Sequence, residues 1–196
     1  KKYNLATAIA RPLIAKTLVN FAKKENAKII AHGCTAKGND QVRFDVGIRS
    51  LNPDIKIIAP MRIWKLSREE EIEYALKNNL KINITKKSIY SIDENIWGRS
   101  IECGNLEDPW NEPLEEIYKW SKITKGHTDS EYIEINFDKG IPISLNDENL
   151  KPLDLILKLN KLAGSYGIGR VDMVENRLIG IKSREIYEAP AAEVLL

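Results

Sequence analysis

The first half of the chain alternates between helical and extended hydrophobic patterns. From residue 9 to residue 24, apolar side chains recur at helical spacing and predict a helix whose buried stripe consists of Ile9, Leu13, Ile14, Leu18, Phe21 and Ala22. Apolar runs at residues 27–31 and 55–59 predict two buried strands, and residues 41–50 predict a helix between them. Helices that alternate with buried strands favour an open parallel sheet, which binds ligands beyond the carboxyl ends of its strands.

This alternation ends after one more helix. Ser67 and Glu70 form a capping box, which predicts a helix from about residue 67 to residue 79. Near residues 85–88 the pattern stops, so we expect a domain boundary there. The sequence is therefore divided into domains of residues 1–86 and 87–196.

The second half follows a different pattern, typical of an α+β domain. Residues 90–128 are mostly polar and are expected to be irregular. Two alternating runs, at residues 132–137 and 141–145, flank a short polar turn and predict a β-hairpin. A helix is expected at residues 152–166, and a second hairpin with strands at residues 171–174 and 178–181.

Composition narrows the class of partner. Of the 196 residues 43% are hydrophobic, which is enough for a core, and 30 basic residues nearly balance 28 acidic ones to leave a net charge of +2. Because the charges nearly balance, the protein has no strong electrostatic field that would attract nucleic acid or an anionic membrane, so we expect small-molecule partners. Two cysteines are too few for a disulfide framework, and no apolar run approaches the roughly 20 residues of a membrane span. We therefore expect a soluble, cytoplasmic protein.

The densest chemistry lies in the loop of residues 31–44, after the first predicted strand. Gly33 and Gly38 have the spacing of a Walker P-loop, but Asn39 and Asp40 stand where that motif needs Lys and then Ser or Thr. The glycines would let the backbone turn sharply and approach a ligand closely. The loop also gathers hydroxyl, ammonium, amide, carboxylate and guanidinium groups, a mixture that suits a zwitterionic ligand.

Four side chains of this loop are the main binding candidates. Arg43 can fork onto a carboxylate, Asp40 can pair with an ammonium, and Thr35 and Asn39 can orient a ligand by hydrogen bonds. The alternative is a polar helix start that Asn39 or Asp40 caps, with Arg43 on a solvated face.

The same loop resembles a known family. Residues 32–44 match the run His-Gly-x-Thr-x-Lys-Gly-Asn-Asp-Gln-Val-Arg-Phe of the argininosuccinate synthases, and residues 57–60, 90–95, 169–177 and 182–190 extend the match. The resemblance implies an open parallel Rossmann-like sheet of the adenine nucleotide alpha hydrolase type, plus part of a second α+β synthetase domain. The chain resembles only the middle half of the family's usual length. The upstream Ser-Gly-Gly-Leu-Asp-Thr-Ser pyrophosphate loop does not occur in it, so we expect a fragment.

The resemblance also implies a reaction. Members of this family are ATP-dependent ligases that join citrulline to aspartate, with Mg²⁺ accompanying the ATP, and they release AMP and pyrophosphate through a citrullyl-adenylate. They are usually homotetramers. Their mechanism positions charges and needs no side-chain nucleophile, which agrees with the sequence: Cys34 and His32 lack the placement of a nucleophile and its base. The two histidines also lack metal-ligand spacing.

Site residues follow from the resemblance position by position. Aspartate is expected at Thr35, Asn39 and Asp40, and the backbone of Gly33 is expected to lie against ATP. Citrulline is expected at Tyr3, Thr7, Asn39, Arg43, Ser91, Ser100, Glu175 and Tyr187. No catalytic side chain is assigned.

Each of these positions also has an ordinary structural explanation. Serines such as Ser91 and Ser100 usually form loops or caps, Glu175 would lie on the surface, and Tyr187 would pack in the core. The sequence also departs from the family at residues 97–99, Trp-Gly-Arg, and at residue 185, where Glu replaces a common Gly.

Two functional hypotheses result. The first is the central part of an argininosuccinate synthase, which we expect to be inactive in isolation because pyrophosphate binding depends on the upstream loop. The second is an amino-acid-binding or subunit-interaction module without catalysis. A Ser-Gly-Gly-x-Asp-x-Ser segment encoded before residue 1 would distinguish them.

Overall fold

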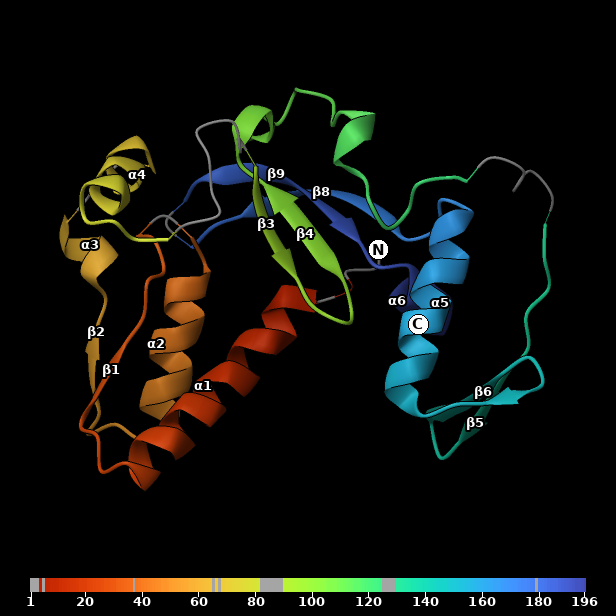
Figure 1. Cartoon of the computed structure of the whole chain (residues 1–196), viewed down its shortest axis with the longest axis horizontal. Helices are drawn as coiled ribbons and strands as arrows, with labels where there is room; N and C mark the ends of the chain where they lie inside the picture. The colour runs from red at the N-terminus through yellow and green to blue at the C-terminus, as the bar shows by residue number, and fades with distance from the viewer. Residues whose placement is uncertain are drawn as a thin grey trace. The chain divides into compact units, whose positions relative to one another are not determined.

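A computed structural model describes residues 4, 6–36, 38–64, 66, 68–81, 90–124, 130–178 and 180–196 (Figure 1). The chain divides into two compact units. Unit 1 comprises Lys1–Thr7, Ser91–Glu175 and Ser183–Leu196, and unit 2 comprises Ala8–Tyr90 and Asn176–Lys182. The boundary expected between residues 86 and 87 lies outside the described residues, as does the capping residue Ser67.

Unit 2 contains the helices and parallel strands of the first half. Its elements are α1 (Ala6–Lys24), β1 (Ile29–Ala31), α2 (Asp40–Leu51), β2 (Lys56–Ile58), α3 (Pro60–Trp64) and α4 (Arg68–Lys77). The first two residues of α1 belong to unit 1, and the helix belongs to unit 2 from Ala8 onward. Strands β1 and β2 pair in parallel, with Ile30 opposite Ile57. The expected strands and parallel pairing are confirmed, and α3 is an additional helix that the sequence pattern did not predict.

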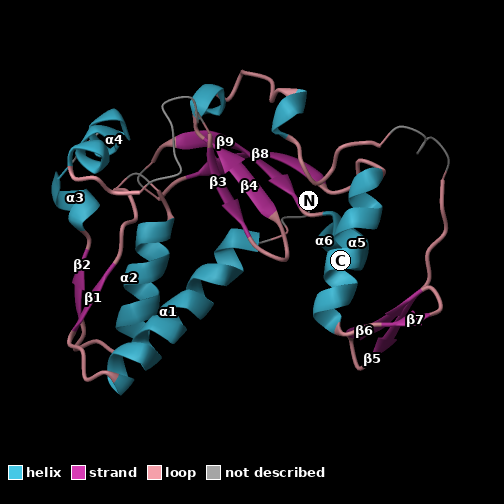
Figure 2. Cartoon of the chain, viewed as in Figure 1, coloured by secondary structure: helices cyan, strands magenta, loops and turns pink. Residues whose placement is uncertain are grey.

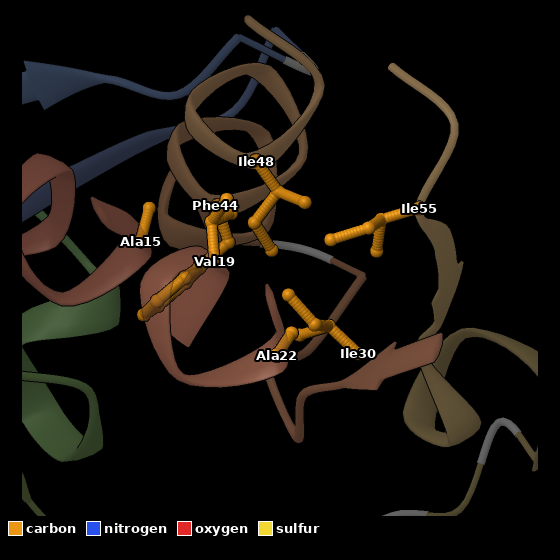
Figure 3. Close-up of a cluster of buried hydrophobic side chains, with 7 residues drawn as sticks. All are labelled: Ala15, Val19, Ala22, Ile30, Phe44, Ile48 and Ile55. Atoms are coloured by element: carbon orange, nitrogen blue, oxygen red, sulfur yellow. The ribbon is translucent and has the colours of Figure 1, made fainter. Parts of the chain in front are cut away.

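The core of unit 2 lies between α1, α2 and the two strands (Figure 3). Its buried side chains are Ala15, Val19, Ala22, Ile30, Phe44, Ile48 and Ile55. The predicted stripe of α1 is confirmed for Ala22, which is buried, and for Leu18, which packs against the core. It is wrong for Ile9, Leu13 and Phe21, which are about 60% exposed or more. The reason is close helix packing, because a Cβ placed on Gly47 of α2 would lie 3.0 Å from the Ala15 Cβ. Small side chains face α2, and the larger apolar ones of α1 point elsewhere.

Unit 1 contains a four-stranded sheet in the order β3-β4-β9-β8 (Figure 2). The strands are β3 (Ser91–Glu94), β4 (Arg99–Glu102), β8 (Arg170–Asn176) and β9 (Lys182–Glu188), and short 3-10 helices follow β4 at Gly104–Glu107 and Glu115–Ile117. The expectation that residues 90–128 are mostly irregular was wrong for β3 and β4. Charged residues in these strands conceal the alternation, and the turn is built by Asn95, whose Oδ1 accepts the backbone N–H of Trp97 and of Gly98.

The turn between β8 and β9 is wider than the sequence predicted. The Arg177 N–H donates to the Ile181 carbonyl at 2.8 Å, and the Gly180 N–H donates to the Arg177 carbonyl at 2.9 Å. These bonds hold Arg177, Gly180 and Ile181 in a turn, so the second strand, expected at residues 178–181, does not form at Gly180 and Ile181. The strand therefore begins at Lys182 instead.

A second, smaller sheet in unit 1 packs against two helices. Strands β5 (Ile135–Asp138), β6 (Ile141–Leu145) and β7 (Glu148–Asn149) are antiparallel, and α5 (Pro152–Ser165) and α6 (Pro190–Leu195) complete the layer. The buried residues are Leu145, Leu155, Leu159 and Ala191. The predicted hairpin and helix are confirmed here. Within the described part of the chain, no helix has the length and apolar character that crossing a membrane requires.

Candidate functional site

The loop between β1 and α2 lies at the carboxyl end of the parallel pair, as the sequence predicted. The His32 N–H donates to the Ile58 carbonyl at 3.0 Å, which extends the ladder by one residue before the loop begins. Neither Gly33 nor Gly38 has a positive φ, so the loop does not use the left-handed freedom of glycine. Among the residues that the structure describes, nothing lies within 4 Å of a Cβ built on Gly33, which leaves space beside its backbone. Lys37 lies outside the described residues.

Asp40 is held between two guanidinium groups. Arg43, one turn along α2, donates from Nη1 to Asp40 Oδ1 at 2.8 Å. Arg11 of α1 donates to Asp40 Oδ2 from Nε at 2.7 Å and lies 2.6 Å from it through Nη2. Two guanidinium groups therefore hold the Asp40 carboxylate, and guanidinium groups are also the side chains best suited to bind the carboxylates of a ligand. Arg11 was missed from the sequence because it lies far from the loop, on the preceding helix.

Asn39 binds backbone rather than capping α2. It occupies the N-cap position, but its side chain makes no cap hydrogen bond. Its Oδ1 accepts the Leu178 N–H at 2.9 Å, and its Nδ2 donates to the Asn176 carbonyl at 3.4 Å. The alternative of an Asn39-capped helix is therefore wrong. Asn39 instead attaches the loop to the segment that follows β8 within unit 2. Thr35 lies beside Gly38, where its Oγ1 would be 3.6 Å from an added Cβ.

The other candidate residues lie on one face of the large sheet in unit 1. Ser100 of β4 is directly opposite Tyr187 of β9 and opposite Asp93 of β3, and directly paired residues share a face. Ser91 shares this face because it is two residues from Asp93. Strand alternation therefore brings Ser91, Ser100 and Tyr187 together.

Tyr187 joins two glutamates to this face. Its hydroxyl contacts Glu175 of β8, and it lies 2.7 Å from Glu185 Oε2. Ser183 donates to Glu185 Oε1 at 3.2 Å. A phenol has one hydroxyl hydrogen and can donate to one carboxylate at a time, so these two carboxylates keep spare acceptor capacity. A ligand ammonium would fit this arrangement, and the expectation that Glu175 is a plain surface residue is not what the structure shows.

The departure from the family at residues 97–99 has a structural role. Trp97 Nε1 donates to the Asn4 carbonyl at 2.9 Å, and Asn95 Nδ2 donates to the Ala6 carbonyl at 3.1 Å. A Cβ on Gly98 would lie 3.0 Å from that of Ala6. The chain before α1 is thus attached to the β3–β4 turn. Asn4 is 3% exposed, and its side-chain amide has no partner among the described residues.

For two of the residues expected to bind citrulline, the structure describes no side chain. Tyr3 lies outside the described residues, and of Thr7 only the backbone, within α1, is described.

The described residues give little support for a metal site or for a cysteine nucleophile. No group of three or more His, Cys, Asp or Glu side chains among them could hold a metal ion. Burial, followed by the negative charge of Asp40, raises the pKa of the Cys34 thiol above its ordinary value, which disfavours the thiolate. The His32 ring contacts the Cys34 backbone rather than its sulfur. These side chains can bind and orient a ligand, and they do not form a nucleophile pair.

Comparison with known proteins places both units in one family. Residues 1–81 match the family described as the arginosuccinate synthase N-terminal HUP domain, and residues 90–196 match the arginosuccinate synthase C-terminal domain. The HUP match agrees with the observed parallel pair and with the expected Rossmann-like nucleotide fold.

Individual relatives agree with the two family matches. The argininosuccinate synthase of Dictyoglomus turgidum is 62% identical over 194 residues, which are 99% of this chain and 48% of the relative. That of Dehalococcoides mccartyi strain 195 is 59% identical over 195 residues, with the same two shares. That of Trichodesmium erythraeum is 59% identical over 196 residues, 100% of this chain and 49% of the relative. The chain thus spans about half the length of the curated relatives it matches.

Proposed function

The chain belongs to the argininosuccinate synthase family, and from this membership we propose that it takes part in the ATP-dependent ligation of citrulline and aspartate. The observation that carries the proposal is the match of both units at 57–62% identity to relatives named for this activity. The polar groups of both units are consistent with it, because both amino acids are zwitterions. The reaction would serve arginine biosynthesis.

The proposed reaction has two steps. The ureido oxygen of citrulline attacks the α-phosphorus of ATP, an O–P bond forms, and pyrophosphate leaves. The amine of aspartate then attacks the ureido carbon, a C–N bond forms, and AMP leaves with the oxygen while the amine gives up a proton. Mg²⁺ would accompany the triphosphate as part of the substrate. Both steps depend on holding reactants close together and on stabilising charge, rather than on a protein nucleophile.

The residues of unit 2 would serve aspartate and ATP. The open space beside Gly33 suits the close approach of a nucleotide. The guanidinium groups of Arg11 and Arg43 beside Asp40 suit a dicarboxylic amino acid, whose ammonium would pair with Asp40. We propose Thr35 and Asn39 as neutral hydrogen-bonding groups for the same substrate.

The residues of unit 1 would serve citrulline. Its ammonium would lie against Glu175 and the Tyr187 hydroxyl, where the described contacts leave acceptor capacity. Ser91 and Ser100 share the face of Tyr187 and would donate to the citrulline carboxylate. Arg43, Tyr3 and Thr7 are proposed for citrulline from the family pattern.

A chimera tests the proposal directly. The 196 residues replace the matched 194 residues of the Dictyoglomus turgidum relative, and AMP release is measured with citrulline, aspartate and ATP. We expect AMP that requires both amino acids, and no steady AMP release from the 196 residues alone. A folded chimera without activity would contradict the proposal. The same chimera, examined by analytical ultracentrifugation, tests the homotetramer that we propose for the whole protein.

The alternative function is an amino-acid-binding or subunit-interaction module. The chain spans 48% of the length of its relatives, and this extent keeps the alternative open to test. Citrulline or aspartate binding by the chain, combined with an inactive chimera, would favour the module over the ligase.

A further inference from the structure

His32 forms a link that the proposed reaction does not use. Its side chain is 5% exposed, and its ring stacks on Phe44 of the unit 2 core with centroids 5.7 Å apart. Nδ1 accepts the backbone N–H of Cys34 at 3.3 Å. Nε2 lies 3.0 Å from Asp45 Oδ1 on α2. One ring therefore contacts both the loop backbone and a helix.

Asp45 is fixed in turn by α3. Arg62 donates from Nη1 to Asp45 Oδ2 at 2.9 Å and from Nη2 to Oδ1 at 3.1 Å, a two-point contact. Burial alone would raise the pKa of Asp45, but the hydrogen bonds from Arg62 and His32 hold it below its ordinary value. Asp45 is therefore an ionised carboxylate, which can only accept hydrogen bonds.

These partners determine which ring nitrogen carries the hydrogen. Nδ1 must present a lone pair, because the Cys34 N–H donates to it. Nε2 must carry the hydrogen, because the Asp45 carboxylate can only accept. A doubly protonated ring would direct a second N–H against that of Cys34. The contacts thus specify a neutral imidazole with its hydrogen on Nε2.

The Cys34 bond closes the backbone around Gly33. The acceptor on residue 32 and the N–H of residue 34 enclose one residue, as the side chain of an Asx-turn does. Gly33 is the residue proposed to lie against ATP, and Thr35, proposed for aspartate, is the first residue after the turn that Cys34 ends. A change in this turn would therefore displace groups proposed for both substrates.

We infer that His32 is a positioning residue, which as a neutral Nε2–H imidazole holds the Gly33 turn in its binding conformation by tying it to Asp45 and Arg62. The consequence for ligands rests on the proposed function. The tautomer and the turn contact do not rest on it, and they can be measured without any substrate.

Two substitutions of His32 test its Nδ1 contact with Cys34 and its Nε2 contact with Asp45 separately. His32→Asn places an oxygen where Nδ1 lies, so it keeps the acceptor for Cys34 and loses the link to Asp45. His32→Gln places an amide N–H near the position of Nε2, so it keeps the Asp45 link and loses the turn acceptor. Both variants lose the stacking on Phe44, which makes each the matched control of the other.

The experiment uses the 196-residue chain for two measurements and the chimera with the Dictyoglomus turgidum relative for a third. Nitrogen-15 NMR of the imidazole in the unsubstituted chain should find the hydrogen on Nε2. The Cys34 amide should exchange with solvent about fivefold to tenfold faster in His32→Gln than in His32→Asn, as expected for one lost hydrogen bond. In the chimera, binding of ATP and aspartate should weaken more in His32→Gln than in His32→Asn, even though thermal unfolding shows similar losses of stability in both variants.

The outcomes are distinguishable. A hydrogen on Nδ1, or equal Cys34 exchange in the two variants, would overturn the inference whether or not the chain binds a nucleotide. Failure of a variant to fold does not remove the test, because the tautomer is measured in the unsubstituted chain. Slow Cys34 exchange in His32→Asn, together with a folded chimera that binds neither ATP nor aspartate, would support the turn contact and count against the proposed function instead.

Discussion

Arg99 and Glu188 face each other across β4 and β9 as a fully buried ion pair. Arg99 Nη1 donates to Glu188 Oε2 at 2.6 Å, and the two side chains are 1% and 0% exposed. Glu188 also accepts the backbone N–H groups of Lys119, Trp120 and Ser121 and the Ser121 hydroxyl, at 2.8 to 3.1 Å. The two residues are directly paired in the register of β4 and β9. One residue along each strand, the same register sets Ser100 opposite Tyr187.

Glu188→Gln should strongly destabilise unit 1. The neutral amide removes the closer of two carboxylates beside the buried Arg99, which keeps only the 3.4 Å contact of its Nε with Glu94 Oε2. The NH₂ group of the amide also faces backbone donors where an acceptor is needed. Breaking a buried pair from one side costs about 3–5 kcal/mol of the free energy of unfolding. Urea denaturation of the chain, followed by circular dichroism, measures this loss.

Glu148→Gln is the matched control. Glu148 pairs with Lys158, but both side chains are about half exposed, so solvent screens the interaction. The free energy of unfolding should change by no more than about 0.5 kcal/mol. Equal losses in the two variants would mean that burial of the Arg99 pair does not determine its contribution.

Glu188 should also give unit 1 a defined response to acid. Burial alone would raise the pKa of Glu188, but the hydrogen bonds from Ser121, Lys119 and Arg99 lower it below the ordinary 4.5. A carboxyl group with a lowered folded-state pKa stabilises fully above its unfolded pKa, and this stabilisation is lost as pH falls through the folded-state pKa. Urea midpoints should therefore fall below about pH 4.5, and Glu188→Gln should flatten that slope. An unchanged slope in the variant would assign the acid response to other carboxylates, such as Asp45.

Alanine substitutions at two glycines should have different effects: Gly164→Ala should lower stability, and Gly33→Ala should weaken nucleotide binding. A Cβ on Gly164 of α5 would lie 1.9 Å from the Trp120 carbonyl oxygen, so Gly164→Ala forces backbone to move and should cost at least about 1–3 kcal/mol. Gly33→Ala meets nothing within 4 Å among the described residues and needs no unusual φ, so the unfolding midpoint should hardly change. Because a methyl group would fill the open space, nucleotide binding should weaken in Gly33→Ala. Retained binding would show that ATP does not approach this backbone.

The elements that could be predicted are those whose pattern is local. The parallel strands and α5 with its preceding hairpin follow from periodicity and turn residues within each segment. The buried face of α1 could not be predicted in this way. It is set by contact with Gly47, about thirty residues further along the chain, and that contact selects Ala15 over the larger Leu13 and Phe21.

In the candidate site, too, the residues with a local sequence signal could be predicted, and those placed by contacts with other elements could not. Loop residues 33–43 were predicted because unlike polar groups cluster there in sequence. Arg11 and Glu185 could not be assigned from the sequence. Arg11 reaches Asp40 from another helix, and Glu185 reaches Tyr187 because residues two apart on a strand share a face. Strand β4 was missed because it buries a charged residue, Arg99, which pairs with Glu188 of β9 where an apolar residue would be expected.

The division of labour between Asp40 and Arg43 is the last prediction, and it uses the active chimera. Asp40→Asn removes the charge proposed to bind the aspartate ammonium, a charge-assisted hydrogen bond whose loss costs about tenfold to a hundredfold in affinity. The KM for aspartate should rise by that factor, and the KM for citrulline should change much less. Arg43→Ala should show the opposite bias, and Arg43→Lys should recover only part of the loss because Lys lacks the planar fork.

The contact between these two side chains makes a double substitution informative. Arg43 donates to Asp40 at 2.8 Å, so Arg43→Ala also removes one of the groups that hold the carboxylate, while Arg11 keeps its own contact. If Arg43 acts only by holding Asp40, the double variant should be no worse than Asp40→Asn, because residues that act through each other are not additive. If Arg43 binds citrulline itself, the two losses should add. The KM for aspartate should then rise because of the Asp40 substitution, and the KM for citrulline because of the Arg43 substitution. Steady-state kinetics with each substrate varied in turn measures both. Equal losses for both substrates in both single variants would contradict the assignment, since they would mean that the Arg11–Asp40–Arg43 cluster shapes the loop as a whole.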